Sequence, residues 1–554
     1  MHILSAAEMQ ACDRLTSERY GVPPLELMRA AGGATAAFAR QQFPQARRVT
    51  VLCGRGNNGG DGMMAALLLA SAGLEVTTLL LGARESLTGD AATVWRELND
   101  LESGPAHGLN HIIETAEELA QHKAALETDL ILDAVVGTGF KPPLKGLAAA
   151  ALNWIKANKA PILAVDLPSG WPADETAATV AGRVFPADAV ITFTAPKPAH
   201  VLGQLTRRWD QPVVVAPIGS PEEAVIAVLG LGLHWAGSAM TLAQAGRPAS
   251  ANKGSFGHVL VVGGALGKSG APAMAALAAL RAGAGLVTAA VPAPVLPLVA
   301  AIAPELMTFP LAATPEGCIS AENFAPELLT ALTSNKTVLA IGPGLGQSPE
   351  TVKFTTGLLS ATKMPAVIDA DALNILAAKP VLLAKLAKGR KLILTPHPGE
   401  MARLAGINVA EVQANRLEVA RGFAQRTGVT LVLKGARTLI AHPDGRVAVN
   451  TTGNPGMAKG GSGDLLTGLI AGLLAQYPAA AAQAIEAAVY LHGLAADLAV
   501  RSADEHTLLA TDSLDQLARA FRSQAFDFGA SGANVYLWLQ GLPSDVAAAH
   551  EAKL

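Results

Sequence analysis

The chain contains two distant segments with one shared order: a run of apolar, mostly β-branched residues, a glycine-rich loop, and an Ala- and Leu-rich helical stretch. In the first segment these are residues 48–53, 54–62 and 63–72, and in the second they are residues 258–262, 263–270 and 273–282. This order is typical of the strand, loop and helix of a nucleotide-binding α/β unit. The two loops do not align residue for residue, so we expect two different α/β domains rather than a duplication.

Short apolar runs continue this alternation through both halves of the chain. In the first half the expected strands are residues 76–81, 130–136, 162–166, 189–193 and 213–217. In the second half they lie near residue 259 and at 286–291, 337–341, 366–368, 392–395 and 430–434, with long Ala-rich helices at 464–474 and 482–499. Strands that alternate with helical segments predict mostly parallel sheets with helices on both faces.

The length of 554 residues leaves room for two large domains. Residues 220–252 contain Gly, Pro and Ser and show no clear order of strands and helices. We therefore place a junction at 223–250, between domains at 1–222 and 251–522. Residues 523–554 have a different composition, with Phe526, Phe528, Tyr536 and Trp538 close together. We leave the role of this last segment open between a docking segment and a poorly ordered tail.

Charge and cysteine content exclude several classes of protein. Lys and Arg number 42 and Asp and Glu number 45, a net charge of −3, whereas a nucleic-acid-binding protein is normally basic. The three cysteines lie far apart without a CxxC pair, which argues against a disulfide framework or a zinc site. The N-terminus has no basic region followed by an apolar run, and prolines interrupt the uncharged stretch 284–303. We expect a cytoplasmic homo-oligomer that acts on small molecules, with no nucleic-acid or membrane partner.

Polar residues follow three expected strands of the first half. The loop at 54–62 carries Asn57, Asn58 and Asp61, and the later strands end at Asp133 and at Asp166 with Ser169. A single aspartate at a strand end is usually the N-cap of the next helix. Three such clusters together favour a ligand site, because ligands of open α/β sheets bind beyond the carboxyl ends of the strands. These oxygens suit a hard cation, or a general acid or base beside a ligand.

In the second half, a glycine-rich loop precedes a helix that begins near Asp464. The backbone N–H groups of Gly460, Gly461, Ser462 and Gly463 can form an anion site at the helix N-terminus. Asp464 can accept a proton from a hydroxyl that attacks a phosphoryl group, which makes it the candidate catalytic base. The alternative is a favourable charge at the helix dipole, worth about 0.3–1 kcal/mol.

Three more strand ends of the second half carry ligand-binding residue types. The loop at 341–346 is glycine-rich, and His397 lies between two prolines in a stiff loop that also contains Glu400, a candidate Mg²⁺ ligand. Residues 434–438 place basic and small groups where nucleotide phosphates can bind. The sequence contains no GxxxxGK[ST] motif, so it is not a P-loop enzyme.

The first half resembles the NAD(P)H-hydrate epimerase domain over about residues 1–220, through the segments GRGNNGGDG, DAVVGTGFKPP and AVDLPSG. The resemblance implies a Rossmann-like three-layer αβα domain that interconverts the R and S epimers of hydrated NADH and NADPH (NADHX and NADPHX). It implies Asp166 as the acid/base residue and a potassium ion held by Asn58, Asp133 and Ser169. The implied hydrate contacts are Asn57, Asn58, Gly59, Gly60, Asp61, Gly137, Thr138, Gly139, Phe140, Lys141, Pro142, Pro143 and Asp166. The chain departs from the family at Arg29, where an acidic residue is usual.

The second half resembles the ADP-dependent NAD(P)H-hydrate dehydratases over about residues 250–522. The segments that carry the resemblance include IGPGLG, DADALN, LTPHPGEMARL, LVLKGART and NPGMAKGGSGDLLTG. It implies a ribokinase-like αβα domain that dehydrates the S epimer, with ADP and Mg²⁺ as nucleotide and metal. The implied hydrate contacts are Ala271, Gly344, Gly346, His397 and Asp464. The implied nucleotide contacts are Lys434, Gly435, Ala436, Arg437, Thr438 and Gly463.

A different function stays open at the level of sequence. A ribokinase-like kinase of a vitamin precursor would carry the same glycine-rich loop, and the first domain would then be a non-catalytic ligand-binding module. A stable phosphorylated product, in place of free phosphate, would identify such a kinase.

Overall fold

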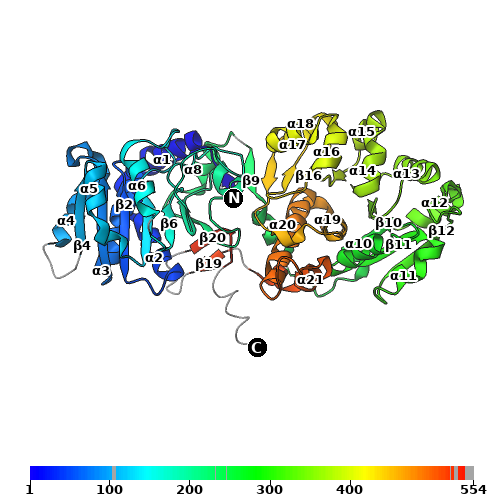
Figure 1. The fold of residues 1–554 in the computed structure, drawn as a ribbon. Coiled ribbons are helices and arrows are strands. Elements are labelled where there is room, and N and C mark those ends of the chain that lie inside the picture. Colours follow the sequence, from blue (N-terminus) through cyan, green and yellow to red (C-terminus); the bar gives the residue numbers. More distant parts are fainter. Residues whose placement is uncertain are drawn as a thin grey trace. The chain divides into compact units, whose positions relative to one another are not determined.

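The computed structural model describes residues 1–102, 108–156, 158–230, 232–244, 246–523, 526–528 and 535–542. Its contacts divide the chain into two compact units (Figure 1). One unit comprises Met1–Gly232 together with the C-terminal strands, and the other comprises Leu233–Ser523. Each unit is built on one large sheet with helices packed against it, which confirms the predicted α/β class.

The sheet of the first unit has the order β4-β3-β2-β5-β6-β7-β8, and all these strands are parallel. The strands are β2 (Arg48–Cys53), β3 (Glu75–Leu81), β4 (Gly108–Ile113), β5 (Leu130–Ala134), β6 (Ile162–Val165), β7 (Ala189–Phe193) and β8 (Val213–Ala216). The order reverses between β2 and β5, so a ligand crevice is expected at the carboxyl ends of these two strands.

Helices cover the sheet of the first unit through two separate apolar clusters. One cluster joins α2 (Pro24–Gln42), α3 (Asn57–Ser71) and α4 (Gly89–Glu102) to the sheet, and the other joins α5 (Ala116–Gln121) and α6 (Gly146–Ile155). The remaining elements of this unit are β1 (His2–Ile3), α1 (Ala6–Tyr20), α7 (Pro198–Leu202) and α8 (Glu222–Ala227). A cluster around Leu4, Met9 and Ala224 packs α1 against α8.

Helix α3 begins six residues earlier than the sequence predicts, because the loop residues 57–62 form its first turns. A Cβ on Gly59 would lie 1.8 Å from the Gly54 carbonyl oxygen, and one on Gly62 would lie 2.4 Å from the Ala134 Cβ. A Cβ on Gly60 would lie 2.5 Å from the Met28 sulfur. These glycines therefore let the helix approach the sheet and α2 closely, and this packing outweighs their low helix propensity.

The sheet of the second unit runs β12-β11-β10-β13-β14-β15-β16-β17-β18-β9, and its strands from β12 to β16 are parallel. The strands are β9 (Leu233–Trp235), β10 (His258–Val262), β11 (Leu286–Pro292), β12 (Met307–Leu311), β13 (Val338–Ile341), β14 (Ala366–Ile368), β15 (Leu392–Leu394), β16 (Thr430–Leu433), β17 (Leu439–Ala441) and β18 (Val447–Val449). The strand order reverses between β10 and β13, which places a second crevice there.

The helices of the second unit include two long, mostly buried ones, α19 (Ser462–Gln476) and α20 (Ala481–Val500). The others are α9 (Met240–Ala243), α10 (Gly270–Arg281), α11 (Leu296–Ala300), α12 (Pro326–Thr333), α13 (Pro349–Ala361), α14 (Ala370–Ala377), α15 (Pro380–Ala387), α16 (Pro398–Ala405), α17 (Val409–Ala414), α18 (Arg416–Thr427), α21 (Ala510–Asp515) and α22 (Leu517–Arg522). Among the described residues no single helix is long and apolar enough to cross a membrane. Only the pair Ser462–Gln476 and Pro478–Val500, bent by 120°, meets that test together, by length and composition.

The region 220–252, in which the sequence showed no clear order, contains α8, β9 and α9. Strand β9 has three residues and pairs in parallel with β18. Elements this short show no periodicity of their own, which explains why the sequence pattern missed them.

The last strands of the chain extend the sheet of the first unit. Strand β20 (Val535–Gln540) pairs antiparallel with β8, and β19 (Phe526–Phe528) pairs with β20. The Tyr536 hydroxyl donates to the Ala34 carbonyl at 3.0 Å, and its ring centroid lies 5.3 Å from that of Phe38 on α2. Part of the segment whose role the sequence left open therefore belongs to the core of the first unit.

We expect Tyr536→Ala to release β20 from β8, because the substitution leaves a cavity of aromatic size, at a cost of about 3–5 kcal/mol. Tyr536→Phe is the matched control, since it removes one hydrogen bond worth about 0.5–1.5 kcal/mol. Amide hydrogen exchange at Val213–Ala216 measures the effect. Unchanged protection of these β8 amides in Tyr536→Ala would contradict a structural role for β20.

Candidate functional site

The first unit has a cavity of about 1380 Å³ at the carboxyl ends of its central strands. It exceeds the size of most small-ligand pockets and can hold a dinucleotide-sized molecule. Residues from all three predicted strand-end segments line it: Asn57, Asn58, Asp61, Gly137, Thr138, Gly139, Phe140 and Asp166. Asp133 and Ser169 are fully buried and are not part of this lining. The structure thus brings together residues that lie more than a hundred positions apart in the sequence.

Helix α1 forms a wall of this cavity that sequence reasoning missed. Gln10, Asp13, Arg14 and Ser17 all line it. Their spacing of three and four residues puts them on one face of the helix. A capping box of Ser5 and Glu8 at the start of α1 is the sequence signal that would have marked this helix.

Asp166 follows β6 and holds a left-handed backbone conformation, with φ of 64°. Its Oδ1 accepts from the Lys197 ammonium and the Thr192 hydroxyl, both at 2.9 Å. Its Oδ2 accepts from the Thr138 backbone N–H at 2.7 Å and from the Thr138 hydroxyl at 2.5 Å. Burial alone would raise the pKa of Asp166, but Lys197 and these donors outweigh it and hold the pKa well below its usual range. The carboxylate is therefore ionised and fully hydrogen-bonded.

Lys197, which directly precedes α7, and His200, within α7, both support Asp166. The Lys197 side chain is 2% exposed. The backbone N–H of Lys197 donates to His200 Nδ1 at 3.0 Å, so Nε2 carries the proton and donates to the Asp166 carbonyl at 2.6 Å. Burial lowers the pKa of His200 to about 4, so its ring is neutral. Sequence reasoning missed both residues, although a lysine close after the predicted strand 189–193 was a usable signal.

The predicted potassium ligands lie around the same strand ends. The Ser169 hydroxyl donates to Asp133 at 2.6 Å, and the Ser169 N–H donates to the other Asp133 oxygen at 2.8 Å. Burial raises the pKa of Asp133 to about 6. Both amide atoms of Asn58 are buried without a hydrogen-bond partner, and a Cβ on Gly137 would lie 3.0 Å from Asn58 Oδ1. The Asn58 amide oxygen, the Asp133 carboxylate and the Ser169 hydroxyl are hard oxygen donors, the chemistry that a hard cation such as K⁺ needs.

Other predicted residues of the first unit lie away from the cavity lining. Gly59 and Gly60 are buried packing positions of α3, and Lys141, Pro142 and Pro143 are exposed on the loop that follows Phe140. Arg29 forms ion pairs of 2.9 Å with Glu26 and with Glu97. The departure from the family pattern therefore gives a surface ion-pair cluster.

The second unit places Asp464 at the third position of α19, directly after the glycine-rich loop. Gly461 has φ of 97°, a left-handed conformation that favours glycine, and the Ser462 hydroxyl donates to the Met457 carbonyl at 2.9 Å. Burial raises the pKa of Asp464 to about 6; Asp369 adds to the shift and Lys434 opposes it. A half-buried carboxylate with this pKa suits a general base near neutral pH.

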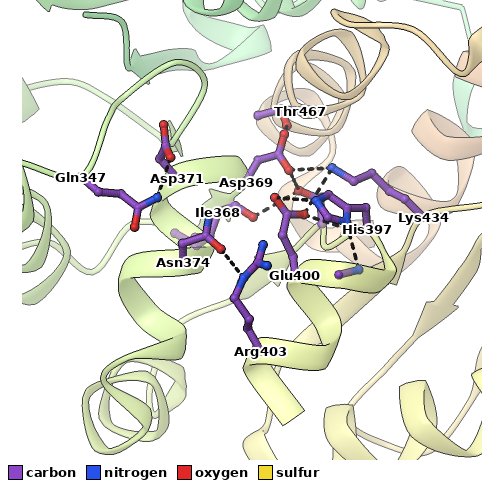
Figure 2. A network of polar contacts seen from close by, with 12 residues as sticks. Gln347, Ile368, Asp369, Asp371, Asn374, His397, Glu400, Arg403, Lys434 and Thr467 are labelled. Carbon is purple, nitrogen blue, oxygen red and sulfur yellow. Dashed lines mark hydrogen bonds and ion pairs between the residues drawn. The ribbon is translucent and has the colours of Figure 1, made fainter. Parts of the chain in front are cut away.

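Asp369 follows β14, and Figure 2 shows its side chain between those of Lys434 and Thr467. Its Oδ1 accepts from Lys434 Nζ at 2.9 Å and from the Thr395 hydroxyl at 2.8 Å, and its Oδ2 accepts from the Thr467 hydroxyl of α19 at 2.8 Å. A Cβ on Gly463 would lie 3.4 Å from Lys434 Nζ. The segment DADALN is part of the family resemblance, but no role was predicted for Asp369, although its position at a strand end was a usable signal.

The predicted nucleotide-binding residues 434–438 form the short loop between β16 and β17. The Lys434 ammonium also lies 4.0 Å from Glu400 Oε2. Burial opposes the charge of Lys434, but Asp369 and Glu400 outweigh burial and raise its pKa. Arg437 is turned into the protein, where its guanidinium donates to the Thr451 carbonyl at 2.9 Å. Gly435 has φ of 138°, and the Thr438 hydroxyl donates to its carbonyl at 2.9 Å.

The predicted hydrate contacts of the second unit lie on neighbouring strand ends. A Cβ on Gly344 would lie 3.3 Å from the Ala271 Cβ, and the Gly346 N–H donates to Asp371 at 2.8 Å. Ala271 lies on α10, whose Met274 sulfur would lie 2.9 Å from a Cβ on Gly461. These contacts place the predicted hydrate contacts Ala271 and Gly344 near the start of α19.

His397 caps α16 and lies beside Glu400. Its Nδ1 accepts from the Gly399 N–H at 3.0 Å, and its side chain is 54% exposed. Glu400 accepts from the His397 N–H at 2.8 Å, and burial raises its pKa. Across the described ranges, no group of three His, Cys, Asp or Glu side chains could hold a metal ion.

Two family models match the chain. Residues 259–519 match the model described as NAD(P)H-hydrate dehydratase, and residues 24–199 match the model described as YjeF-related protein N-terminus. The two matches fall in the second and the first unit, respectively.

Similar proteins cover nearly the whole chain. The bifunctional NAD(P)H-hydrate repair enzyme Nnr of Moorella thermoacetica is 42% identical over 542 residues, which are 94% of this chain and 97% of that protein. The enzyme of the same name from Escherichia coli is 36% identical, over 94% of each chain. A crystal structure of ADP/ATP-dependent NAD(P)H-hydrate dehydratase from Bacillus subtilis, co-crystallised with ATP and Mg²⁺, is 34% identical with a TM-score of 0.44. It covers 51% of this chain and 96% of that chain.

We expect Lys197→Met to lower the free energy of unfolding of the first unit by about 3–5 kcal/mol at neutral pH, because it leaves the Asp166 carboxylate buried without its cation. Amide hydrogen exchange of β6 and β7 across a urea series reports on this unit alone. The double variant Lys197→Met, Asp166→Asn removes both charges and should lose less than the single variant. Equal losses in the two variants would argue against the ion pair as the cause.

Proposed function

The chain belongs to the family of bifunctional NAD(P)H-hydrate repair enzymes, and we propose which of its residues carry out each of the two reactions. Its epimerase domain interconverts the R and S hydrates of NADH and NADPH, and its dehydratase domain returns the S hydrate to NAD(P)H with a nucleotide as co-substrate. The observation that carries the residue-level proposal is the position of Asp464 beside Asp369 and Lys434 at the N-terminus of α19.

In the dehydratase reaction Asp464 acts as the base. Hydroxide is a poor leaving group, so the C6 hydroxyl of the hydrate has to be activated. Asp464 removes the hydroxyl proton while the oxygen attacks the β-phosphoryl group of ADP and releases AMP. The ring nitrogen lone pair then expels phosphate from C6, and loss of a ring proton restores NADH or NADPH.

The residues around Asp464 stabilise the phosphoryl group in transfer. The backbone N–H groups of the glycine-rich loop and of the first turn of α19 favour anions, as at other helix N-termini. Lys434, held by Asp369 and Glu400, places a positive charge beside Gly463. Mg²⁺ bound with the nucleotide would neutralise phosphate charge, and Glu400 would offer it a carboxylate oxygen.

In the epimerase reaction the cavity of the first unit binds the hydrate. Asp166 stays ionised and can take a proton from the water or hydroxyl that attacks C6. Asn58, Asp133 and Ser169 would hold K⁺, which would supply positive charge near the substrate.

The bounds 1–222 for this domain and 251–522 for the dehydratase domain belong to the same proposal. A vitamin-precursor kinase is not favoured, because relatives named as repair enzymes match both halves of the chain.

The proposal is tested with the full-length protein and a mixture of R and S hydrates of NADH. Recovery of NADH is followed by absorbance with ADP, with ATP and with neither nucleotide. We expect ADP-dependent recovery of both epimers, with release of free phosphate. A stable phosphorylated product would instead identify a kinase.

We expect Asp464→Asn to slow dehydration by about 10²–10⁴-fold, the usual contribution of a positioned base. Epimerisation of a single hydrate epimer should be unchanged, because Asp166 lies in the other unit. Asp515→Asn on the exposed face of α21 is the matched control. Retained ADP-dependent turnover in Asp464→Asn would remove this residue from the base role.

We expect Asp369→Asn to shift the acid limb of the dehydratase pH profile to lower pH. In the wild type, kcat/KM should fall as pH drops below about 6, where Asp464 becomes protonated. Removal of the Asp369 charge lowers the pKa of Asp464, since that charge helps to raise it. Thr395→Val also loses a contact to Asp369 but keeps its charge, so its acid limb should stay in place. If the wild type, Asp369→Asn and Thr395→Val all had the same acid limb, this would contradict an effect of the Asp369 charge on the pKa of Asp464.

A further inference from the structure

Epimerisation at C6 needs a proton donor that Asp166 does not provide. The C–O bond to C6 breaks only when the departing hydroxide receives a proton. Asp166 accepts hydrogen bonds from Lys197, Thr192 and twice from Thr138, and these hold it in the ionised form. A second group in the same cavity therefore has to carry the proton. This inference rests on the epimerase activity proposed above.

Asp13 on α1 has the features of such a donor. It lines the cavity, and its Oδ1 is buried without a hydrogen-bond partner in the part of the chain that the structure describes. A buried carboxyl oxygen without a partner is costly unless a proton or a ligand satisfies it. Helix α1 lies before the first residue, 24, of the matched epimerase-type region, so no motif of that region includes Asp13.

The charges that face Asp13 come from three other elements. Asp61 lies on α3, Asp166 follows β6, and Lys197 precedes α7. Burial raises the pKa of Asp13 to about 6, with Lys197 opposing the shift and Asp166 adding to it. On α1 itself, Arg14 and Glu18 also line the cavity, and the Cys12 thiol is buried beside Asp13.

We propose that Asp13 is a catalytic residue of the epimerase site and donates the proton to the departing C6 hydroxyl. The C6–O bond breaks with its electron pair on oxygen, the nitrogen lone pair forms a C6=N bond, and the Asp13 proton completes a water molecule. Water then adds to the opposite face of C6 and gives its proton to Asp166. Asp166 is the stronger acid, so this proton returns to Asp13 through water in the cavity.

Asp13→Asn in the full-length protein tests the proposal. One purified epimer of NADH hydrate is incubated without nucleotide at pH 5–9, and the other epimer is measured by chromatography against the spontaneous rate. We expect a fall of at least about 10²-fold. The wild-type rate should decline as pH rises above about 6, where Asp13 loses its proton, and this alkaline limb should be absent from the residual rate of Asp13→Asn.

Asp100→Asn is the matched control, because Asp100 is an exposed carboxylate of α4 outside the described lining of the cavity. Its rate and pH profile should match the wild type. Asp13→Glu keeps a carboxylic acid at this position and should recover both epimerase activity and an alkaline limb. Calorimetry shows whether Asp13→Asn still binds the hydrate. If it does not, the activity and pH profile of Asp13→Glu decide between a proton donor and a binding residue. A wild-type alkaline limb in Asp13→Asn, or an Asp13→Glu variant as slow as Asp13→Asn, would overturn the proposal. Absence of epimerisation in the wild type would instead overturn the proposed function.

Discussion

Both units depend on a backbone contact that leaves no room for a Cβ at the point where the strand order reverses. After β2, a Cβ on Gly54 would lie 1.9 Å from the Val135 carbonyl oxygen, which follows β5. After β10, a Cβ on Gly263 would lie 2.2 Å from the Pro343 carbonyl oxygen, which follows β13. This approach brings neighbouring strand ends together, and the polar side chains that follow them share one crevice. Asp166 follows β6 in the first unit and Asp369 follows β14 in the second, so both carboxylates lie at this edge of their sheets.

Each crevice then separates the properties of its carboxylates. In the first unit, Lys197 and the Thr138 donors keep Asp166 ionised, whereas burial raises the pKa of Asp13 and of Asp133 to about 6. In the second unit, Asp369 is bound to Lys434, and its charge helps to raise the pKa of the neighbouring Asp464. Carboxylates with different proton affinities in one site can take different roles in acid–base chemistry.

The strands and strand-end residues could be predicted from the sequence because their signals are local. Apolar runs mark β5 and β10, and the loop that follows each of β2 and β10 is rich in glycine. The start of α3 was wrong, because packing of Gly59 and Gly62 against the sheet overrides the low helix propensity of glycine. The contribution of α1 to the cavity and the pairing of Lys197 with Asp166 could not be predicted, because tertiary folding alone brings these segments together.

The position of β20 also determines when the first unit can be completed. Its sheet ends in β8 (Val213–Ala216), but the strand that covers this edge is residues 535–540, beyond the whole second unit. During synthesis, β8 must remain an unpaired edge until almost three hundred further residues, 233–523, have left the ribosome. A gene that encoded only the first 232 residues would produce a sheet with that edge exposed. Separating the two units at residue 232 therefore leaves the β8 edge uncovered unless the C-terminal strand is supplied again.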